Sequence, residues 1–208
     1  MEFQHPCTVI VSGPSGSGKT EFCKRLVSWS YLMISPPPES ILWCYNQWQP
    51  AYEEMKDWWG VELRNGVPQR EQLISERSVR KLVVLDDMMR VMKDDPLLLE
   101  LFTEGSHHWN VSVIFISQMC FFGDRATRSN AHYNVLMNSP ADKLQIMNLA
   151  RQMKPGKTGL FMDAYTDAVN RKPYNYLLIQ NKPMVPDSER FCTDIFPDEV
   201  PTVYLIDG

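Results

Sequence analysis

The amino-acid sequence predicts an α/β protein with a mostly parallel central sheet flanked by helices. Short apolar runs rich in β-branched residues alternate with stretches of helical character along most of the chain. Near-continuous apolar strands that alternate with helices are typical of a parallel sheet covered on both faces. In addition, residues 13 to 20 read GPSGSGKT, a glycine-rich turn between the first expected strand and the first expected helix.

Six strands and four helices are expected from the spacing of the apolar residues. The expected strands are residues 7–12, 41–45, 82–85, 111–116, 133–137 and 176–179, and the expected helices are residues 20–33, 50–59, 96–104 and 141–153. The run Pro36-Pro37-Pro38 cannot continue the first helix, because proline lacks a backbone N–H, so it marks a connector to the second strand. We expect the strand that precedes the glycine-rich turn to be central in the sheet.

The glycine-rich turn has the spacing and the context of a phosphate-binding P-loop, which identifies a P-loop NTPase. In such a loop the backbone N–H groups at the start of a helix surround the β-phosphate. The lysine bridges the β- and γ-phosphates, and the hydroxyl that follows it binds Mg²⁺. The expected phosphate-binding residues are Gly13, Pro14, Ser15, Gly16, Ser17, Gly18, Lys19 and Thr20, with Lys19 also catalytic and Thr20 also a metal ligand.

A second acidic element is needed to hold the metal and to activate water, and the run KLVVLDD at residues 81–87 has the form of a Walker B motif. We expect Asp86 to reach the Mg²⁺ shell and Asp87 to act as the general base for the attacking water. Alternatively, the two carboxylates end a strand and cap the next helix. Gln118 follows another apolar strand, and it would sense the γ-phosphate if that strand lies between the P-loop and Walker B strands.

The sequence favours ATP over GTP, because the segment closest to a guanine-reading Asn-Lys-x-Asp motif, at residues 181–184, lacks the aspartate. ATP and Mg²⁺ are therefore the expected cofactors. Two arginines, Arg125 and Arg128, lie in a polar stretch soon after Gln118. Either could neutralise transition-state charge at a neighbouring subunit of a ring ATPase. The residue types fit a solvated loop equally well.

Composition and charge narrow the setting in which the protein acts. The five cysteines form no Cys-x-x-Cys pair, so reduced thiols in an intracellular protein fit best. The longest apolar run, residues 111–122, is well short of the roughly 20 residues that span a bilayer, and we expect no membrane partner. The first residues run directly into the P-loop strand without the pattern of a signal peptide.

We expect a P-loop ATPase domain over residues 1–185 and an acidic, proline-containing tail over residues 186–208, packed on the core or leaving it. The tail has six carboxylates against one arginine, a net charge of −5. Because the whole chain carries −4, the first 185 residues carry +1. A nucleic-acid partner must therefore be bound by local basic groups rather than by a positive body. The candidates for phosphate contact are Arg77, Arg80, Lys154, Lys157, Arg171 and Lys172.

Several segments in their order along the chain resemble the DNA-packaging ATPases of the FtsK–HerA superfamily. They are Asp86-Asp87, then LFTEGSHH at residues 101–108, then VIFISQ at residues 113–118, then RSNAHY at residues 128–133. The similarity is closest to the poxvirus-type packaging ATPase and its relatives in Polinton-like and adintovirus-like elements, and it covers residues 9 to about 197. It implies an ASCE-type, RecA- or FtsK-like fold.

The resemblance also implies an oligomeric ring that moves double-stranded viral DNA into a preformed capsid, with ATP hydrolysed between subunits. Carried over by position, Gln118 is the sensor and Arg128 the preferred arginine finger, with Arg125 second. The capsid or portal protein is the implied partner, in the host nucleus or a cytoplasmic virus factory and in association with the virion. One departure concerns residues 137–142, MNSPAD, which lack two basic residues that the family usually has after the fifth strand.

Two other functions remain compatible with a P-loop. The first is a nucleotide or nucleoside kinase, which would transfer phosphate to a small acceptor without stimulation by DNA. The second is an ATP-regulated capsid assembly factor with negligible turnover. The kinase is disfavoured by the lack of a dense arginine cluster after the Walker B strand. The assembly factor requires Asp87 to be displaced from the attacking water.

Overall fold

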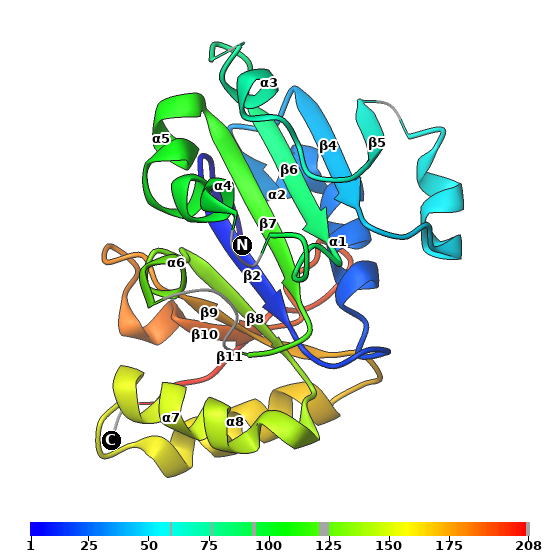
Figure 1. Ribbon diagram of the computed structural model, residues 1–208. Helices are drawn as coiled ribbons and strands as arrows, with labels where there is room; N and C mark the ends of the chain where they lie inside the picture. The colour runs from blue at the N-terminus through cyan, green and yellow to red at the C-terminus, as the bar shows by residue number, and fades with distance from the viewer. Residues whose placement is uncertain (59, 76, 93–94, 121–124, 207–208) are drawn as a thin grey trace.

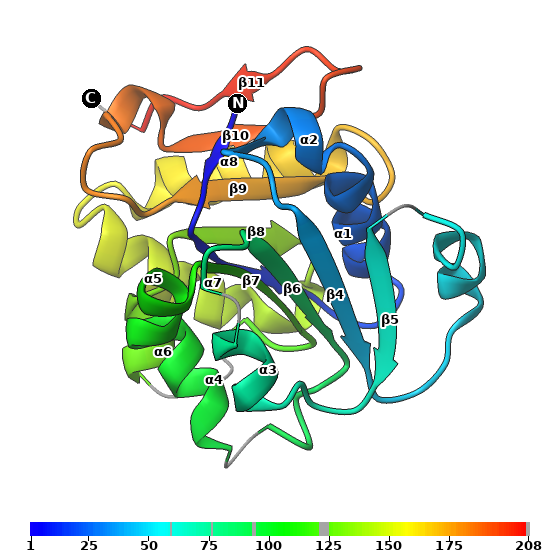
Figure 2. The same ribbon diagram turned by 90° about the horizontal axis from the view of Figure 1, so that it is seen from above.

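The structure is a computed structural model that describes residues 1–58, 60–75, 77–92, 95–120 and 125–206. A nine-stranded sheet forms its centre. Its strand order is β11-β10-β9-β8-β2-β7-β6-β4-β5, as Figures 1 and 2 show. The strands from β8 to β5 are parallel to one another, whereas β9, β10 and β11 alternate in direction. The expected α/β class with a mostly parallel sheet is confirmed.

The strands of this sheet are β2 (Thr8–Ser12), β4 (Ser40–Tyr45), β5 (Val61–Asn65), β6 (Lys81–Asp86), β7 (Val111–Ser117), β8 (Tyr133–Met137), β9 (Tyr176–Gln180), β10 (Phe191–Thr193) and β11 (Thr202–Val203). Two further short strands, β1 (Phe3–Gln4) and β3 (Ile34–Ser35), pair with each other in parallel. The α-helices are α1 (Lys19–Ser28), α2 (Ser30–Met33), α3 (Arg70–Ile74), α4 (Pro96–Glu100), α5 (Ser106–Trp109), α6 (Arg125–Ser129), α7 (Lys143–Met153) and α8 (Thr158–Asn170). Short 3-10 segments are η1 (Pro50–Met55), η3 (Pro140–Asp142) and η4 (Asp187–Glu189), and η2 (Leu101–Gly105) is a π-helical turn.

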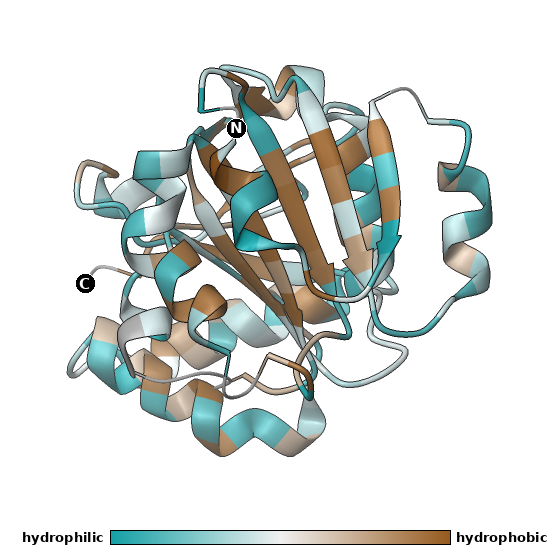
Figure 3. Cartoon of the chain, turned by 45° about the horizontal axis from the view of Figure 1, so that its top comes forward, coloured by the Kyte–Doolittle hydropathy of each residue, from teal (hydrophilic) through white to brown (hydrophobic). Residues whose placement is uncertain are grey.

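The helices cover both faces of the sheet. Alternate residues of β2 show the division, since Val9 and Val11 pack with α1, α2 and η1, while Ile10 packs with the segment from α3 to α5. The helices α7 and α8 cover β8 and β9 on the same side as Leu136, forming a third cluster. Figure 3 shows hydrophobic colour running along the central strands. Burial on both faces explains why these strands read as continuous apolar runs.

All six expected strands are present, and the P-loop strand β2 is central, fifth of the nine. The helices differ more from expectation. The helix expected at residues 20–33 is interrupted at Trp29, and the segment expected as a helix at residues 50–59 is the 3-10 segment η1. The third expected helix continues through a π-helical turn into α5. Local propensity does not explain this difference, since η1 begins with a proline, which suits a first helical turn, and contains the good helix formers Ala51, Glu53, Glu54 and Met55.

The longest helix of the described residues, α8, was not predicted. Its buried residues Phe161, Ala164, Tyr165 and Ala168 follow an i, i+3, i+4, i+7 pattern, so the signal was present in the sequence. The segment after residue 185, expected as an acidic, proline-containing tail, contributes β10 and β11 to one edge of the sheet. These strands are too short to show a period-2 pattern, and they form because β10 pairs with β9 and β11 pairs with β10.

Candidate nucleotide site

The P-loop connects the end of β2 to the start of α1, and two of its glycines are required by their surroundings. A Cβ atom at Gly13 would lie 2.7 Å from Cβ of Met137. Gly18 has φ +95°, a left-handed conformation that residues with a side chain rarely adopt. A Cβ atom at Gly18 would also lie 2.7 Å from Cβ of Tyr174. The sequence Gly18-Lys19 therefore lets the chain turn sharply into α1 against a neighbouring side chain.

Lys19 and Thr20 begin α1 and lie at the carboxyl edge of the sheet. The Nζ atom of Lys19 donates to the carbonyl oxygen of Pro14 at 2.7 Å, across the mouth of the loop. Burial lowers the pKa of Lys19, while the nearby Asp86 and Asp87 act in the opposite direction. A buried ammonium held by a single carbonyl is incompletely solvated, which favours its interaction with an anion entering the loop.

Asp86 ends β6 and is almost fully buried. Its Oδ2 atom accepts hydrogen bonds from the hydroxyl of Thr20 at 3.2 Å and from that of Tyr52 at 2.8 Å. Burial raises the pKa of Asp86 to about 6, although both hydrogen bonds favour the ionised form. The structure thus brings Thr20, in α1, close to Asp86, the predicted first Walker B aspartate at the end of β6.

Asp87, directly after β6, and Gln118, directly after β7, face each other. The Nε2 atom of Gln118 donates to Oδ1 of Asp87 at 3.2 Å. Asp87 has φ +56°, an uncommon conformation for a residue with a side chain, which re-aims the chain directly after β6. The strand β7 lies between β2 and β6, which is the strand order on which the predicted role of Gln118 depended. Both side chains therefore lie at the edge of the sheet that carries the P-loop.

The donor set at this edge fits a Mg²⁺ ion that also binds nucleotide phosphates. A hydroxyl oxygen of Thr20 and a carboxylate oxygen of Asp86 lie 3.2 Å apart, and oxygen is the ligand atom that Mg²⁺ prefers. In the described part of the chain there is no group of three or more His, Cys, Asp or Glu residues arranged to hold a metal. A site with two protein ligands is compatible with Mg²⁺, which commonly keeps several waters and binds through substrate phosphates.

The two candidate arginine fingers belong to α6. The C-terminal end of this helix adjoins the start of β2, since the carbonyl of Asn130 accepts a hydrogen bond from the hydroxyl of Thr8 at 2.7 Å. The start of β2 lies at the opposite end of the strand from the P-loop. Arg128 is partly buried in α6. The side chain of Arg125 lies outside the described part of the chain, so its predicted role stays a prediction.

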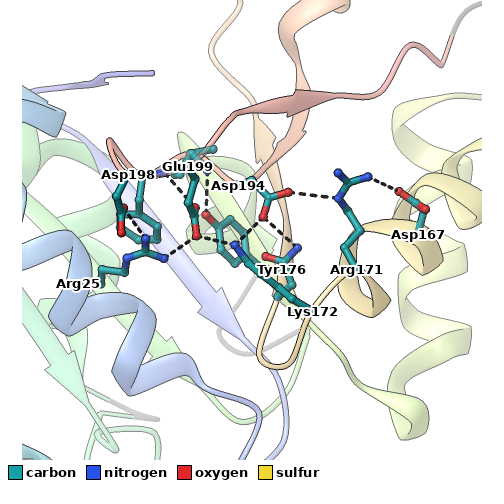
Figure 4. A network of polar contacts seen from close by, with 11 residues as sticks. Arg25, Asp167, Arg171, Lys172, Tyr176, Asp194, Asp198 and Glu199 are labelled. Carbon is teal, nitrogen blue, oxygen red and sulfur yellow. Dashed lines mark hydrogen bonds and ion pairs between the residues drawn. The ribbon is translucent and has the colours of Figure 1, made fainter.

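The basic residues predicted to contact DNA phosphates include Arg80, Lys154, Arg171 and Lys172, which make ion pairs with carboxylates of the described part of the chain. Arg80 pairs with Glu39 at 3.4 Å, and Lys154 pairs with Asp187 at 2.7 Å. Figure 4 shows the other two, Arg171 and Lys172, beside the carboxylates of the C-terminal segment. DNA contacts by these four side chains would have to compete with existing carboxylate partners.

Sequence reasoning missed two tyrosines at the site. Tyr52 is fully buried in η1, and its hydroxyl reaches Asp86 from a segment 34 positions earlier. Tyr174 lies on the turn between α8 and β9 and packs against Gly18. The segment around Tyr52, NQWQPAYEEMKD at residues 46–57, is mostly polar and gave no local signal that this tyrosine is buried. The position of Tyr174 depends on the pairing of β9 with β8.

The poxvirus A32 protein family matches residues 63–203, which is more than half of the chain. The chain belongs to this family. The match includes Asp86, Asp87 and Gln118, and it ends at the last residue of β11. No curated protein sequence matches the chain significantly. Membership of the poxvirus A32 protein family confirms the expected resemblance to a poxvirus-type ATPase.

Solved structures similar to this A32 family member are P-loop ATPases. The DNA-packaging ATPase B204 from Sulfolobus turreted icosahedral virus is 10% identical, with a TM-score of 0.57 over 96% of this chain and 97% of that protein. EssC (ATPases 2 and 3) from Geobacillus thermodenitrificans is 12% identical, with a TM-score of 0.58 over 98% of this chain and 40% of that one. The type VII secretion ATPase EccC from Thermomonospora curvata is 13% identical, with a TM-score of 0.57 over 86% of this chain and 24% of that one. At these identities the likeness establishes the P-loop ATPase fold.

No helix in the described ranges of this A32 family member is long and apolar enough to cross a membrane.

Proposed function

We propose that this A32 family member is an ATP-driven motor that translocates double-stranded viral DNA into a preformed capsid. The observation that carries the proposal is the convergence of Thr20, Asp86, Asp87 and Gln118 at the edge of the sheet that holds the P-loop. This arrangement suits hydrolysis of a nucleoside triphosphate, and one protein of known structure that the chain resembles over nearly its whole length is a viral DNA-packaging ATPase.

The P-loop and its lysine would bind ATP. The backbone N–H groups from Gly13 to Gly18 would surround the β-phosphate, and Lys19 would leave the Pro14 carbonyl to bridge the β- and γ-phosphates. Thr20 and Asp86 would hold Mg²⁺, which when bound neutralises charge on the phosphates. Because Asp86 is buried with a raised pKa in the free protein, a cation beside it would stabilise its ionised form.

Asp87 would act in the hydrolysis step, and Gln118 would sense the loss of the γ-phosphate. Asp87 would accept a proton from the attacking water, whose oxygen bonds to the γ-phosphorus while the bond to the β-phosphate oxygen breaks. Gln118 already donates to Asp87, so its amide is within reach of the space in front of that carboxylate. Loss of the γ-phosphate would change the partners of Gln118 and thereby the position of β7.

Hydrolysis would take place between subunits of a homo-oligomeric ring. Arg128, with Arg125 second, would act at the nucleotide of a neighbouring subunit, as the resemblance to the FtsK–HerA packaging ATPases implies. DNA contacts would be made to phosphates, because a motor must move along any sequence. A capsid or portal protein would anchor the ring in the host nucleus or in a cytoplasmic virus factory.

Steady-state ATP hydrolysis with and without long double-stranded DNA tests the proposal. We expect DNA to stimulate hydrolysis by the wild-type chain, and we expect both Lys19→Ala and Asp87→Asn to abolish the activity. Lys19→Ala should also weaken ATP binding, whereas Asp87→Asn should retain it. Hydrolysis that is indifferent to DNA would overturn the motor, and a chain that binds ATP without turnover would favour an assembly factor instead.

A further inference from the structure

Tyr174 has an unusual conformation for an aromatic residue. It lies on the turn between α8 and β9, directly after Pro173, with φ +60°, and 69% of its surface is exposed. A turn of Lys172 to Asn175 is closed by a hydrogen bond from the Asn175 N–H to the Lys172 carbonyl at 3.3 Å. Proline followed by a residue with positive φ is the pattern of a type II turn, where glycine or asparagine is favoured at the second position.

The conformation of Tyr174 is not explained by stability. A left-handed conformation costs roughly 1–2 kcal/mol in a residue with a Cβ atom. An aromatic ring that remains largely exposed recovers little of this cost through burial of apolar surface. Strained residues of this kind concentrate at ligand-binding sites, where the surrounding structure holds them.

The position of Tyr174 places it beside the P-loop. Tyr176, two residues later, pairs with Met137 at the end of β8, so the turn lies at the carboxyl edge of the parallel strands. A Cβ atom at Gly18 would lie 2.7 Å from Cβ and 3.2 Å from Cγ of Tyr174. The Cβ and Cγ atoms of Tyr174 therefore pack against Gly18, the residue that directly precedes Lys19.

Tyr174 lines hollows that also include residues of the phosphate-binding loop. One is lined by Gly18, Lys19, Thr20, Gln49, Ala51 and Tyr174, among others. Another lies between residues 14–17 of the P-loop and residues 169–174, and a third includes Gly18 and residues 172–176. These hollows offer space for the sugar and base of a nucleotide whose phosphates occupy the loop.

The turn that carries Tyr174 is held by the C-terminal segment, as Figure 4 shows. Nζ of Lys172 lies 2.7 Å from Oδ1 of Asp194 and 2.5 Å from Oε1 of Glu199. Nε of Arg171 lies 3.2 Å from the other oxygen of Asp194. The amide of the buried Asn175 donates to the same carboxylate at 3.3 Å. These contacts fix the turn on both sides of Tyr174.

The C-terminal segment that contacts this turn also contacts α1, the helix that follows the P-loop. Nη1 of Arg25, in α1, lies 2.7 Å from the same Oε1 of Glu199 that Lys172 contacts. The guanidinium of Arg25 also lies 4.1 Å from the centre of the Phe196 ring. The turn and α1 are thus tied to one short stretch of the C-terminal segment, which keeps the position of Tyr174 constant relative to the P-loop.

We propose that Tyr174 is the platform on which the purine base of the bound nucleotide stacks. This inference rests on the nucleotide site of the proposed function and extends it to the recognition of the base. Stacking uses the face of the ring and not the phenolic hydroxyl, so phenylalanine would serve equally. The phosphates would be held by the P-loop, independently of this residue.

The test compares binding of Mg·ATP with binding of inorganic tripolyphosphate, which has no base, by calorimetry on the full chain. The variants are Tyr174→Ala, Tyr174→Gly and Tyr174→Phe, and Tyr31→Ala is the matched control because Tyr31 is 79% exposed on α2. We expect Tyr174→Ala and Tyr174→Gly to weaken ATP binding about 10- to 100-fold and to leave tripolyphosphate binding unchanged. Tyr174→Phe and Tyr31→Ala should bind both ligands as the wild type does.

Three outcomes would overturn the proposal that the base stacks on Tyr174. ATP binding that survives in both small variants would show that the ring does not contact the base. Equal losses for ATP and tripolyphosphate would show that the ring only shapes the P-loop. A wild-type chain that binds neither ligand would overturn the nucleotide site itself and the platform with it. Tyr174→Gly keeps the test valid if Tyr174→Ala fails to fold, because glycine adopts φ +60° without strain.

Discussion

The hydroxyl of Tyr52 and the hydroxyl of Thr20 donate to the same carboxylate oxygen of Asp86, at 2.8 and 3.2 Å. Burial nevertheless raises the pKa of Asp86 from 3.8 to about 6. A carboxyl group whose pKa is higher in the folded than in the unfolded chain binds protons more readily when folded. Its contribution to stability is therefore present at low pH and is lost as the pH rises through 6.

Asp86→Asn should accordingly stabilise the nucleotide-free protein at pH 8. The amide oxygen can still accept from both hydroxyls, and no charge is buried. We expect the free energy of unfolding in urea to rise by roughly 2–3 kcal/mol at pH 8 and to be little changed at pH 4, while ATP hydrolysis is lost. The control is Asp163→Asn at an exposed carboxylate of α8, which should change neither. A loss of stability in Asp86→Asn at pH 8 would contradict this account.

The core of this site could be predicted because its chemistry imposes local sequence patterns. A loop that surrounds a phosphate needs glycines at fixed positions before Lys19, and a metal-binding carboxylate needs an apolar strand that ends in aspartate. Both patterns are contained in fewer than ten residues, so the sequence alone located Thr20 and Asp86. The strand order, with β7 between β2 and β6, was only a condition in the sequence reasoning, and the structure supplies it together with the 3.2 Å contact of Thr20 and Asp86.

The residues that were missed are positioned by tertiary structure. Tyr52 reaches Asp86 from a 3-10 segment after a different strand, and no local pattern marks that contact. The left-handed conformation of Tyr174 depends on the pairing of β9 with β8 and on the carboxylates of Asp194 and Glu199. Likewise β10 and β11 are only a few residues long, and their neighbours in the sheet define them.

Gly18→Ala should lower the free energy of unfolding more than the same substitution at another glycine with positive φ. Gly156 is the matched control, since it has φ +78° and a Cβ atom there would meet nothing within 4 Å. We expect Gly156→Ala to cost about 1 kcal/mol, from backbone strain alone, in urea unfolding without nucleotide. Gly18→Ala should cost about 1–3 kcal/mol more, because the new methyl group overlaps Tyr174.

The overlap can be separated from the strain by combining variants. In a Tyr174→Gly background, the excess cost of Gly18→Ala over Gly156→Ala should largely disappear. An excess that persists without the tyrosine side chain would show that another contact, and not Tyr174, restricts position 18.

His132 should make the stability of the protein depend on pH in the opposite sense to Asp86. Its Nδ1 atom accepts from the backbone N–H of Thr8 at 3.0 Å, and its ring packs against that of His107. Burial lowers the pKa of His132 to about 4, with the positive charge of Lys182 acting in the same direction. A histidine with a lowered pKa contributes stability that is complete above pH 6.5 and is lost as the pH falls toward 4.

The expected size is about 1–2 kcal/mol between pH 7.5 and pH 4.5, allowing for the partial exposure of the ring. The measurement is the difference in the free energy of unfolding between wild type and His132→Asn at each pH. Taking the difference removes the contribution of His5, whose pKa is also lowered by burial. The difference should narrow as the pH falls, and a difference that stays constant would contradict a neutral buried imidazole.

The proposed role of Arg128 at a neighbouring subunit can be tested by mixing two inactive proteins. Arg128→Ala keeps an intact P-loop, and Lys19→Ala keeps an intact arginine. We expect each protein alone to have its DNA-stimulated ATPase activity lowered roughly 1,000-fold. Mixed rings contain interfaces in which an intact P-loop meets an intact Arg128, so mixing should restore a measurable part of the activity.

The same mixing experiment distinguishes Arg128 from Arg125. If Arg125 supplies the charge instead, Arg125→Ala should be the variant that loses activity alone and recovers it with Lys19→Ala, while Arg128→Ala stays active. If Arg128 acts on the nucleotide of its own subunit, no mixture can combine the two intact groups, and the activity should stay at the level of the separate proteins.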